Sequence, residues 1–298
     1  MDPLVFLLVA GAAVLHVTWN VLLKTAGDPL RAAAVGMATA AAVICPAALV
    51  AWLVVGRPAV PTETLVLSVV SGVLEALYFA FLASAYRRGD LSLVYPLARG
   101  TAPLLAVAIG VGLLGERLGP VGFAGVACLL VGLLSLQRPW QYLRASGRAS
   151  SGAAGFALLT GVTIAAYSAV DRVGVRGTEP WIYAGLIWAS CAVFLWAYAL
   201  VYWRRTPSRP ADADPASPFS APRAAVGGLI TLGAYLLILV AFTVAPLTAV
   251  APLRESAIVL ASGWGAFRLR EAADRADALQ RIGSAALVVV GAVLLAID

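Results

Sequence analysis

Long apolar runs separated by short polar breaks occupy this chain from end to end. Each run has about 20 to 25 residues, and a helix of that length spans the hydrocarbon core of a bilayer. The breaks between them carry Gly, Pro and Asp, as in Gly27-Asp28-Pro29, and such residues end helices. We expect an all-α integral membrane protein with ten transmembrane helices, at residues 3–23, 31–55, 63–86, 91–113, 118–137, 152–172, 180–203, 223–245, 247–268 and 276–297.

The composition indicates that lipid is the solvent of these helices. Hydrophobic residues make up 61% of 298 positions, charged residues 12%, and the mean hydropathy is +0.92, which is more apolar surface than a soluble domain of this size needs. The net charge of +6 comes from arginines between the runs rather than from a basic stripe interleaved with aromatic residues. The expected partner is therefore the lipid bilayer and not nucleic acid. Asp2 stands where a signal peptide would carry positive charge, so residues 3–23 are interpreted as a span.

One stretch occurs twice. Residues 91–97 (LSLVYPL) return 156 positions later as residues 247–253 (LTAVAPL), and Tyr78 matches Tyr235 at almost the same offset. A boundary near residue 150 gives two units, 1–150 and 151–298, with five expected helices each. Because five is odd, the second unit enters the membrane from the opposite side, so the sequence predicts an inverted repeat around an axis in the membrane plane.

The repeated stretch carries matched prolines, each followed by an arginine. Pro96 and Pro252 each leave a helix carbonyl without its donor, and paired breaks of this kind point to the central site of a transporter. Arg99 and Arg254 are costly at membrane depth unless they face protein or a wet cavity. The two prolines are the predicted hinges, and the two arginines are predicted to attract a substrate carboxylate.

Polar side chains on the first and third runs extend this candidate site. His16, Trp19 and Asn20 share one helix face and are suited to a zwitterionic, aromatic substrate, or else they bond neighbouring helices. Glu75 shares a face with Tyr78. An ionised carboxylate at that depth has to be protonated, paired with Arg99 or Arg254, or wetted by the cavity.

Aromatic residues within the runs are candidates for lining the cavity. Those selected as binding residues are Tyr95, Tyr167, Trp188 and Tyr235, with packing as the alternative for each. Aromatic residues at the ends of runs are expected instead at the membrane interface; these are Trp181, Tyr183, Tyr202 and Trp203. The small residues Ala124, Cys128 and Gly132 predict a close helix contact.

The distribution of Lys and Arg predicts the orientation. Fifteen of them fall in loops after the odd-numbered runs, against four in the other loops: Arg57, Arg117, Arg172 and Arg176. Since positive loops stay in the cytoplasm, both termini are predicted on the outer, periplasmic face of a bacterial-type inner membrane.

Motifs for several other functions are missing from the sequence. It holds no phosphate-binding P-loop, no HExxH or Cys/His metal spacing and no GxSxG elbow. No cofactor, metal or catalytic residue is therefore expected. The alternative of an intramembrane enzyme would have only one His and Glu75 as candidate catalytic groups, which is weak evidence for it. A receptor or structural bundle does not explain an inverted repeat with matched breaks.

Residues 114–118 (LGERL), followed by Gly122, Gly125 and Gly132, resemble the signature that ends each half of the EamA family in the drug/metabolite transporter superfamily. A looser copy is Leu269-Arg270-Glu271. The resemblance implies ten helices in two inverted halves around a central cavity, and the chain is most similar to the bacterial aromatic amino-acid exporters of that group. Glu116 and Glu271 are interpreted as interfacial ion-pair residues. Many relatives are drawn with cytoplasmic termini, whereas the charge count of this chain predicts the opposite.

The expected function is a secondary transporter or facilitator that exports neutral metabolites, aromatic amino acids first, by alternating access. The alternatives are a multidrug, nucleobase or sugar-phosphate transporter of the same superfamily. Proton coupling through Glu75 or His16 stays open. Two five-helix halves already enclose a cavity, so a monomer is expected to suffice.

Overall fold

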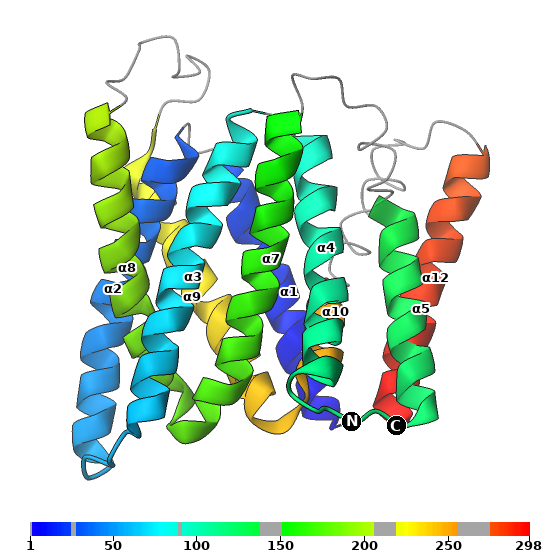
Figure 1. Cartoon of the computed structure of the whole chain (residues 1–298), viewed down its shortest axis with the longest axis horizontal. Helices are drawn as coiled ribbons and strands as arrows, with labels where there is room; N and C mark the ends of the chain where they lie inside the picture. The colour runs from blue at the N-terminus through cyan, green and yellow to red at the C-terminus, as the bar shows by residue number, and fades with distance from the viewer. Residues whose placement is uncertain (1, 25–27, 89–90, 138–150, 206–218, 256–274) are drawn as a thin grey trace.

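The chain folds into a bundle of long helices that lie side by side (Figure 1). This computed structural model describes residues 2–24, 28–88, 91–137, 151–205, 219–255 and 275–298. All regular structure within those residues is helical. The helices are α1 (Pro3–Lys24), α2 (Pro29–Val54), α3 (Thr62–Tyr86), α4 (Leu91–Gly112), α5 (Pro120–Gln137), α7 (Ser151–Gly174), the short 3-10 helix η1 (Val175–Gly177), α8 (Pro180–Arg205), α9 (Ala221–Val244), α10 (Leu247–Glu255) and α12 (Arg275–Ile297).

Local sequence accounts for where these helices begin and end. Proline occupies a first-turn position of α2, where its fixed φ suits a helix start, and the Asp28 carboxylate accepts from the backbone N–H groups of Leu30 and Arg31 at 3.0 and 3.1 Å. After α2 the chain reverses through Gly56 and Arg57, whose φ angles are +89° and +58°. The predicted boundaries agree with the observed ones to within a few residues. Of the predicted run 247–268, only the part up to Glu255 is described.

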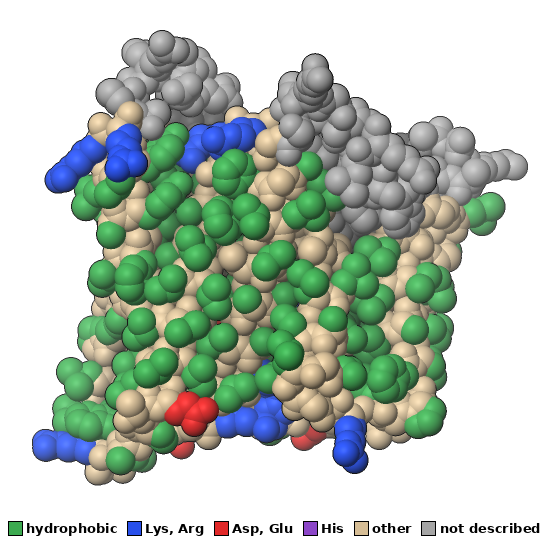
Figure 2. Space-filling view, viewed as in Figure 1, with side chains coloured by type: hydrophobic (Ala, Val, Ile, Leu, Met, Phe, Trp, Pro, Cys, Tyr) green, Lys and Arg blue, Asp and Glu red, His purple; other side chains and the backbone are tan. Residues whose placement is uncertain are grey.

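The face of the bundle that Figure 2 shows is apolar along its length. Six described helical segments are long and apolar enough to cross a membrane: Pro3–Asn20, Pro29–Val54, Thr62–Tyr86, Gly152–Gly177, Pro180–Arg205 and Ala221–Val244. Three shorter apolar stretches lie at Leu97–Gly112, Pro120–Ser135 and Ile282–Leu295. Large side chains such as Leu7 and Val54 are 72% and 80% exposed, which only lipid makes favourable over so wide a surface. The chain is a multi-pass membrane protein, and the count of ten spans stays a prediction.

Helices from the first part of the chain pack mainly on helices from the second part. α1 lies against α9, α2 against α8 and α9, α3 against α7 and α8, α4 against α7 and α10, and α5 against α12. Helices adjacent in sequence, such as α1 and α2, touch much less. The surface shared by the two parts therefore runs through the centre of the bundle, where buried polar groups gather.

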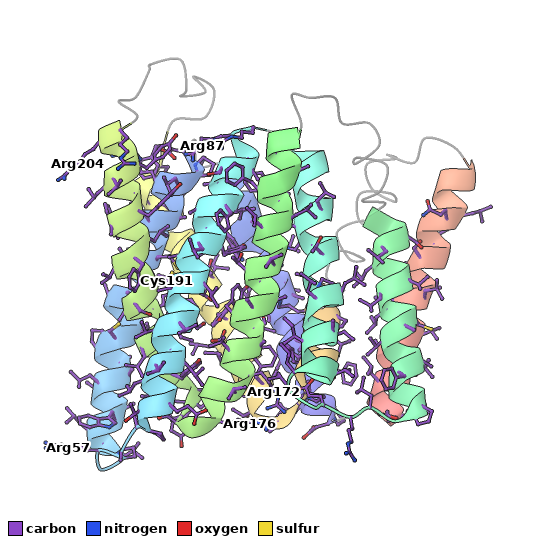
Figure 3. The ribbon with its side chains drawn as sticks, viewed as in Figure 1. Arg57, Arg87, Arg172, Arg176, Cys191 and Arg204 are labelled. Atoms are coloured by element: carbon purple, nitrogen blue, oxygen red, sulfur yellow. The ribbon has the colours of Figure 1, made fainter. Side chains whose placement is uncertain are left out.

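Charged side chains collect at the two ends of the bundle. Arg87 and Arg204 mark one end, and Arg57, Arg172 and Arg176 mark the other (Figure 3). Three arginines of the first end lie over aromatic rings, with Arg31 over Phe219, Arg87 over Tyr202 and Arg88 over Phe156 at 4.3, 4.4 and 4.6 Å. Such pairs are typical of residues held at a membrane interface.

Glycines bring α5 and α12 close together at one side of the bundle (Figure 1). A Cβ atom on Gly125 would lie 2.9 Å from the Gly291 carbonyl oxygen, and one on Gly132 would lie 2.8 Å from the Ser284 oxygen. The predicted close contact at Gly132 is present, but Ala124, which we expected in the same ridge, is exposed. The ridge follows Gly125 rather than Ala124.

We expect Gly132→Ala to destabilise the protein by about 1–3 kcal/mol, because the added methyl group pushes α12 away from α5. Gly155→Ala is the matched control: Gly155 also lies inside a helix, and a Cβ there meets nothing within 4 Å. That variant should keep or slightly raise the midpoint of thermal unfolding in detergent. Equal midpoints for the two variants would contradict the close packing of α5 and α12.

Candidate functional site

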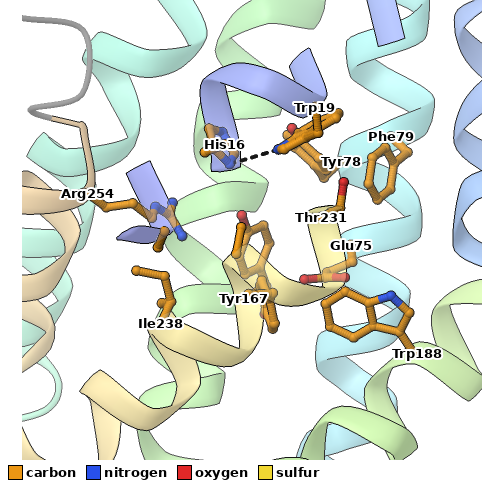
Figure 4. A pocket seen from close by; sticks show the side chains of 13 residues that line it. His16, Trp19, Glu75, Tyr78, Phe79, Tyr167, Trp188, Thr231, Ile238 and Arg254 are labelled. Atoms are coloured by element: carbon orange, nitrogen blue, oxygen red, sulfur yellow. Dashed lines mark hydrogen bonds between the residues drawn. The ribbon is translucent and has the colours of Figure 1, made fainter. Parts of the chain in front are cut away.

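A small cavity lies in the centre of the bundle, lined by side chains from six helices (Figure 4). Eight predicted site residues surround it: His16, Trp19, Glu75, Tyr78, Tyr167, Trp188, Tyr235 and Arg254. Ala12, Phe79, Thr231, Ala234 and Ile238 complete the lining. The volume open to the centre of a water molecule is about 30 Å³, room for about two waters. The structure thus brings these eight residues together around one small cavity, and their role in binding stays a prediction.

Aromatic rings form a continuous row across the cavity. Tyr78 lies between Phe79 and Tyr167, with ring centroids 4.7 and 6.1 Å away, and Tyr235 lies between Tyr167 and Trp188 at 6.0 and 4.7 Å. Most of these contacts are edge-to-face, the geometry that the ring quadrupole favours. The row offers ring faces and edges to an aromatic or cationic group.

Nitrogen groups gather on one side of the cavity. The Trp19 indole N–H donates to Nδ1 of His16 at 2.9 Å, and a guanidinium nitrogen of Arg99 contacts Nε2 of the same ring. A neutral imidazole has one acceptor nitrogen, so His16 cannot accept from both neighbours. Arg254 also lines this side, with its guanidinium carbon 6.0 Å from the centre of the Tyr167 ring. These groups make one side of the cavity rich in donors and positive charge.

A carboxyl group occupies the other side. Glu75 on α3 is 4% exposed, and Figure 4 shows it beside Trp188, with Tyr167 between it and Arg254. The Tyr235 hydroxyl is in hydrogen-bonding reach of it, and Asp171 and Arg254 are near enough to act on it through their charges. The cavity is therefore polarised, with guanidinium and imidazole groups on one side and a carboxyl group on the other.

Asp171 is the buried residue that the sequence analysis missed. It lies on α7 with 0% exposure, and its two carboxylate oxygens accept from the hydroxyls of Tyr183, at 3.2 Å, and Tyr235. The rule that selected Glu75, an acid within an apolar run, applies equally to Asp171 in the predicted run 152–172, but it was not applied there. Tyr183, expected at the membrane interface, is instead fully buried against Asp171.

Glu116 joins four parts of the chain at one end of the bundle. Its carboxylate accepts from the backbone N–H groups of Leu247 and Thr248, at 2.7 and 2.9 Å, and so caps the start of α10. It also pairs with Arg172 of α7 at 3.3 Å, and Arg172 donates to the Phe242 carbonyl of α9 at 2.8 Å. Arg172 was assigned to a loop from the sequence but lies buried in α7. The interpretation of Glu116 as an ion-pair residue is confirmed, whereas Glu271 lies outside the described residues.

The other predicted site residues lie elsewhere. Asn20 donates to the carbonyl of His16 on its own helix at 2.8 Å and does not line the cavity. Arg99 reaches the cavity through His16 rather than lining it. Pro252 is buried inside α10, two positions before Arg254. Tyr95 and Pro96 belong to α4, but their side chains lie outside the described residues.

No metal centre is apparent in the described ranges: no three His, Cys, Asp or Glu residues there come together as ligands. The described cysteines, Cys45, Cys128 and Cys191, are all free thiols. The polarised aromatic cavity is thus the site with the most concentrated chemistry in the described part of the chain.

The fold and this cavity define a helical, multi-pass membrane protein with a polar centre, and comparison with known proteins makes the class more specific. Residues 3–137, the part of the chain from α1 to the end of α5, match the model of the EamA-like transporter family. No curated protein matches the chain. The predicted likeness to aromatic amino-acid exporters is therefore not tested.

Solved structures extend the likeness to nearly the whole chain. Twenty-nine chains match. One of them, titled "Crystal structure of protein", has 19% sequence identity and a TM-score of 0.70, with 98% of each chain covered. At that identity the likeness shows a shared fold, which includes the part of the chain beyond residue 137.

Proposed function

We propose that this protein is a secondary transporter of the drug/metabolite superfamily that exports neutral, zwitterionic metabolites, with aromatic amino acids as the first candidates. The match of residues 3–137 to the EamA-like transporter family supports transport rather than enzymatic chemistry. The observation that carries the substrate class is the polarised cavity, with Arg254 and His16 on one side, Glu75 on the other and aromatic rings between them.

A zwitterion satisfies both sides of this cavity at once. Its carboxylate accepts from the Arg254 guanidinium group and from the His16 ring, which both line the cavity, while Arg99 adds positive charge from behind His16. Its ammonium group lies by Glu75, and an aromatic side chain packs on the row of rings. A substrate that carries only one of the two charges makes only part of these contacts, so it is expected to bind more weakly.

The proposed architecture is ten spans in two inverted repeats, with residues 1–150 forming one and 151–298 the other. The reciprocal packing supports it: exchange of the two halves turns the contact of α1 with α9 into that of α7 with α3, and the contact of α2 with α9 into that of α8 with α3. Rocking of the halves, with Pro96 and Pro252 as hinges, then gives alternating access. A monomer holds the complete cavity.

The proposed orientation places both termini on the outer face of a bacterial-type inner membrane. The end of the bundle with Arg87 and Arg204 also carries Arg31, Arg88 and Arg205. At the opposite end, Glu63, Glu116, Glu179 and Asp298 offset the arginines. This asymmetry supports a cytoplasmic location for the arginine-rich end.

Uptake by proteoliposomes containing the purified full chain tests the substrate class. We expect uptake of labelled phenylalanine and tryptophan above that of protein-free liposomes, weaker uptake of threonine, and none of a lipophilic cation. Parallel assays with and without a pH gradient separate a facilitator from a proton-coupled transporter. Uptake of the cation alone would contradict the proposal and favour a multidrug transporter that uses Glu75 as the partner of the cation.

A further inference from the structure

Asp171 lies behind the cavity and holds two phenols by their hydroxyl groups. It is fully buried, and it accepts from Tyr183 through Oδ1 and from Tyr235 through Oδ2. It does not line the cavity itself. Its hydrogen-bonded link to the cavity is Tyr235, which lines the cavity and packs edge-to-face on Trp188, with ring centroids 4.7 Å apart.

The bond to Asp171 decides what the Tyr235 oxygen presents to the cavity. A phenol has one O–H to donate and two lone pairs that accept. Because the O–H points to Asp171, the Tyr235 oxygen has only its lone pairs to offer to the cavity, which Glu75 lines as well. Glu75 and Tyr235 therefore both present acceptors to the cavity, and a donor is needed to bond them together.

Two donors meet this need: the proton of a neutral Glu75 carboxyl, or an N–H of a bound ligand. A primary ammonium group carries three donors and a positive charge, so it bonds Glu75 and Tyr235 together. The ring faces beside it, those of Trp188 and Tyr167, add cation–π attraction. A carboxylate or a neutral carbonyl group supplies no donor here.

We propose that Asp171 is a positioning residue that makes the Glu75 side of the cavity specific for an ammonium group, by holding the Tyr235 O–H away from Glu75. This inference deepens the proposed function and rests on the same cavity. It adds that selectivity for amines depends on a residue that never contacts the substrate.

The test measures binding to the purified full chain with two probes that each carry one end of phenylalanine: phenethylamine, which has only the amine, and 3-phenylpropionate, which has only the carboxylate. Quenching of tryptophan fluorescence reports on both. Asp171→Ala leaves Tyr235 free to donate to Glu75, so the affinity for phenethylamine should fall by about tenfold or more, while that for 3-phenylpropionate stays within about twofold. Glu179→Gln removes an exposed acid near the same end of α7 and should change neither affinity.

A purely structural role of Asp171 would weaken both probes equally, and that result would overturn the inference. Failure of the unaltered protein to bind phenethylamine would overturn it as well. If Asp171→Ala does not fold, Tyr235→Phe removes the acceptor oxygen directly and should show the same selective loss; equal loss of both probes would again contradict the inference. Binding of phenethylamine without transport of phenylalanine would refute the proposed function alone.

Discussion

Replacement of Glu75 by glutamine is expected to lower kcat/KM for phenylalanine by about a hundredfold. Glutamine keeps the shape of the side chain but removes the negative charge that we assign to the ammonium group, and its amide N–H donates to the Tyr235 oxygen in place of the ligand. Loss of one partner of a buried charge pair costs about 3–5 kcal/mol, and about 2.7 kcal/mol already gives a hundredfold. Initial rates of uptake into proteoliposomes measure the effect.

The matched control for this change is on the same helix. Glu63 lies in the first turn of α3 and is exposed, so Glu63→Gln removes an equal charge without touching the cavity and should keep kcat/KM within about twofold. If Glu75→Gln and Glu63→Gln transport phenylalanine equally well, Glu75 does not bind the ammonium group and the substrate proposal loses its main support.

Removal of the Glu116 side chain is expected to be the most destabilising single change outside the cavity. Glu116→Ala leaves the Arg172 guanidinium without its carboxylate and leaves two backbone N–H groups at the start of α10 uncapped. The side chains of Arg172 and Glu116 are only 10% and 9% exposed, so loss of the pair should cost about 3–5 kcal/mol. The midpoint of thermal unfolding in detergent should fall by about 10 °C.

Two further variants show whether the capping bonds or the charge matters. Glu116→Gln keeps a carbonyl oxygen that accepts from Leu247 and Thr248, so its midpoint should lie between those of Glu116→Ala and the unaltered protein. Arg117→Ala changes the exposed neighbour of Glu116 and should leave the midpoint within about 1 °C. If Arg117→Ala lowers the midpoint as much as Glu116→Ala does, the loop, and not the contacts of Glu116 with α7 and α10, determines the stability.

The helices could be predicted closely from the sequence because their causes are local. Apolar length, proline and glycine breaks and a capping Asp28 act within a few residues, and the predicted run 63–86 corresponds to α3 at Thr62–Tyr86. Most of the other correct predictions followed from the cost of placing a charged group within the membrane. A carboxylate or guanidinium within an apolar run has to face the interior, which placed Glu75 and Arg254 at the cavity.

Contacts with partners far away in the sequence were not predicted. Glu116 meets Leu247 131 positions away, and Tyr183 meets Asp171 across a change of helix, and no local pattern encodes either contact. Asp171 is a different case: it lies within the predicted run 152–172 but was not selected as a site residue. In the structure α7 continues past it to Gly174.

Counterflow of phenylalanine tests the central claim most directly, because exchange needs no assumption about the coupling ion. Proteoliposomes that contain the purified full chain are loaded with unlabelled phenylalanine and diluted into a trace of labelled phenylalanine. The account predicts transient accumulation of label above the level in unloaded proteoliposomes, and none when the internal load is 3-phenylpropionate. Label that enters loaded, unloaded and protein-free liposomes equally would contradict transport of a zwitterion through this cavity.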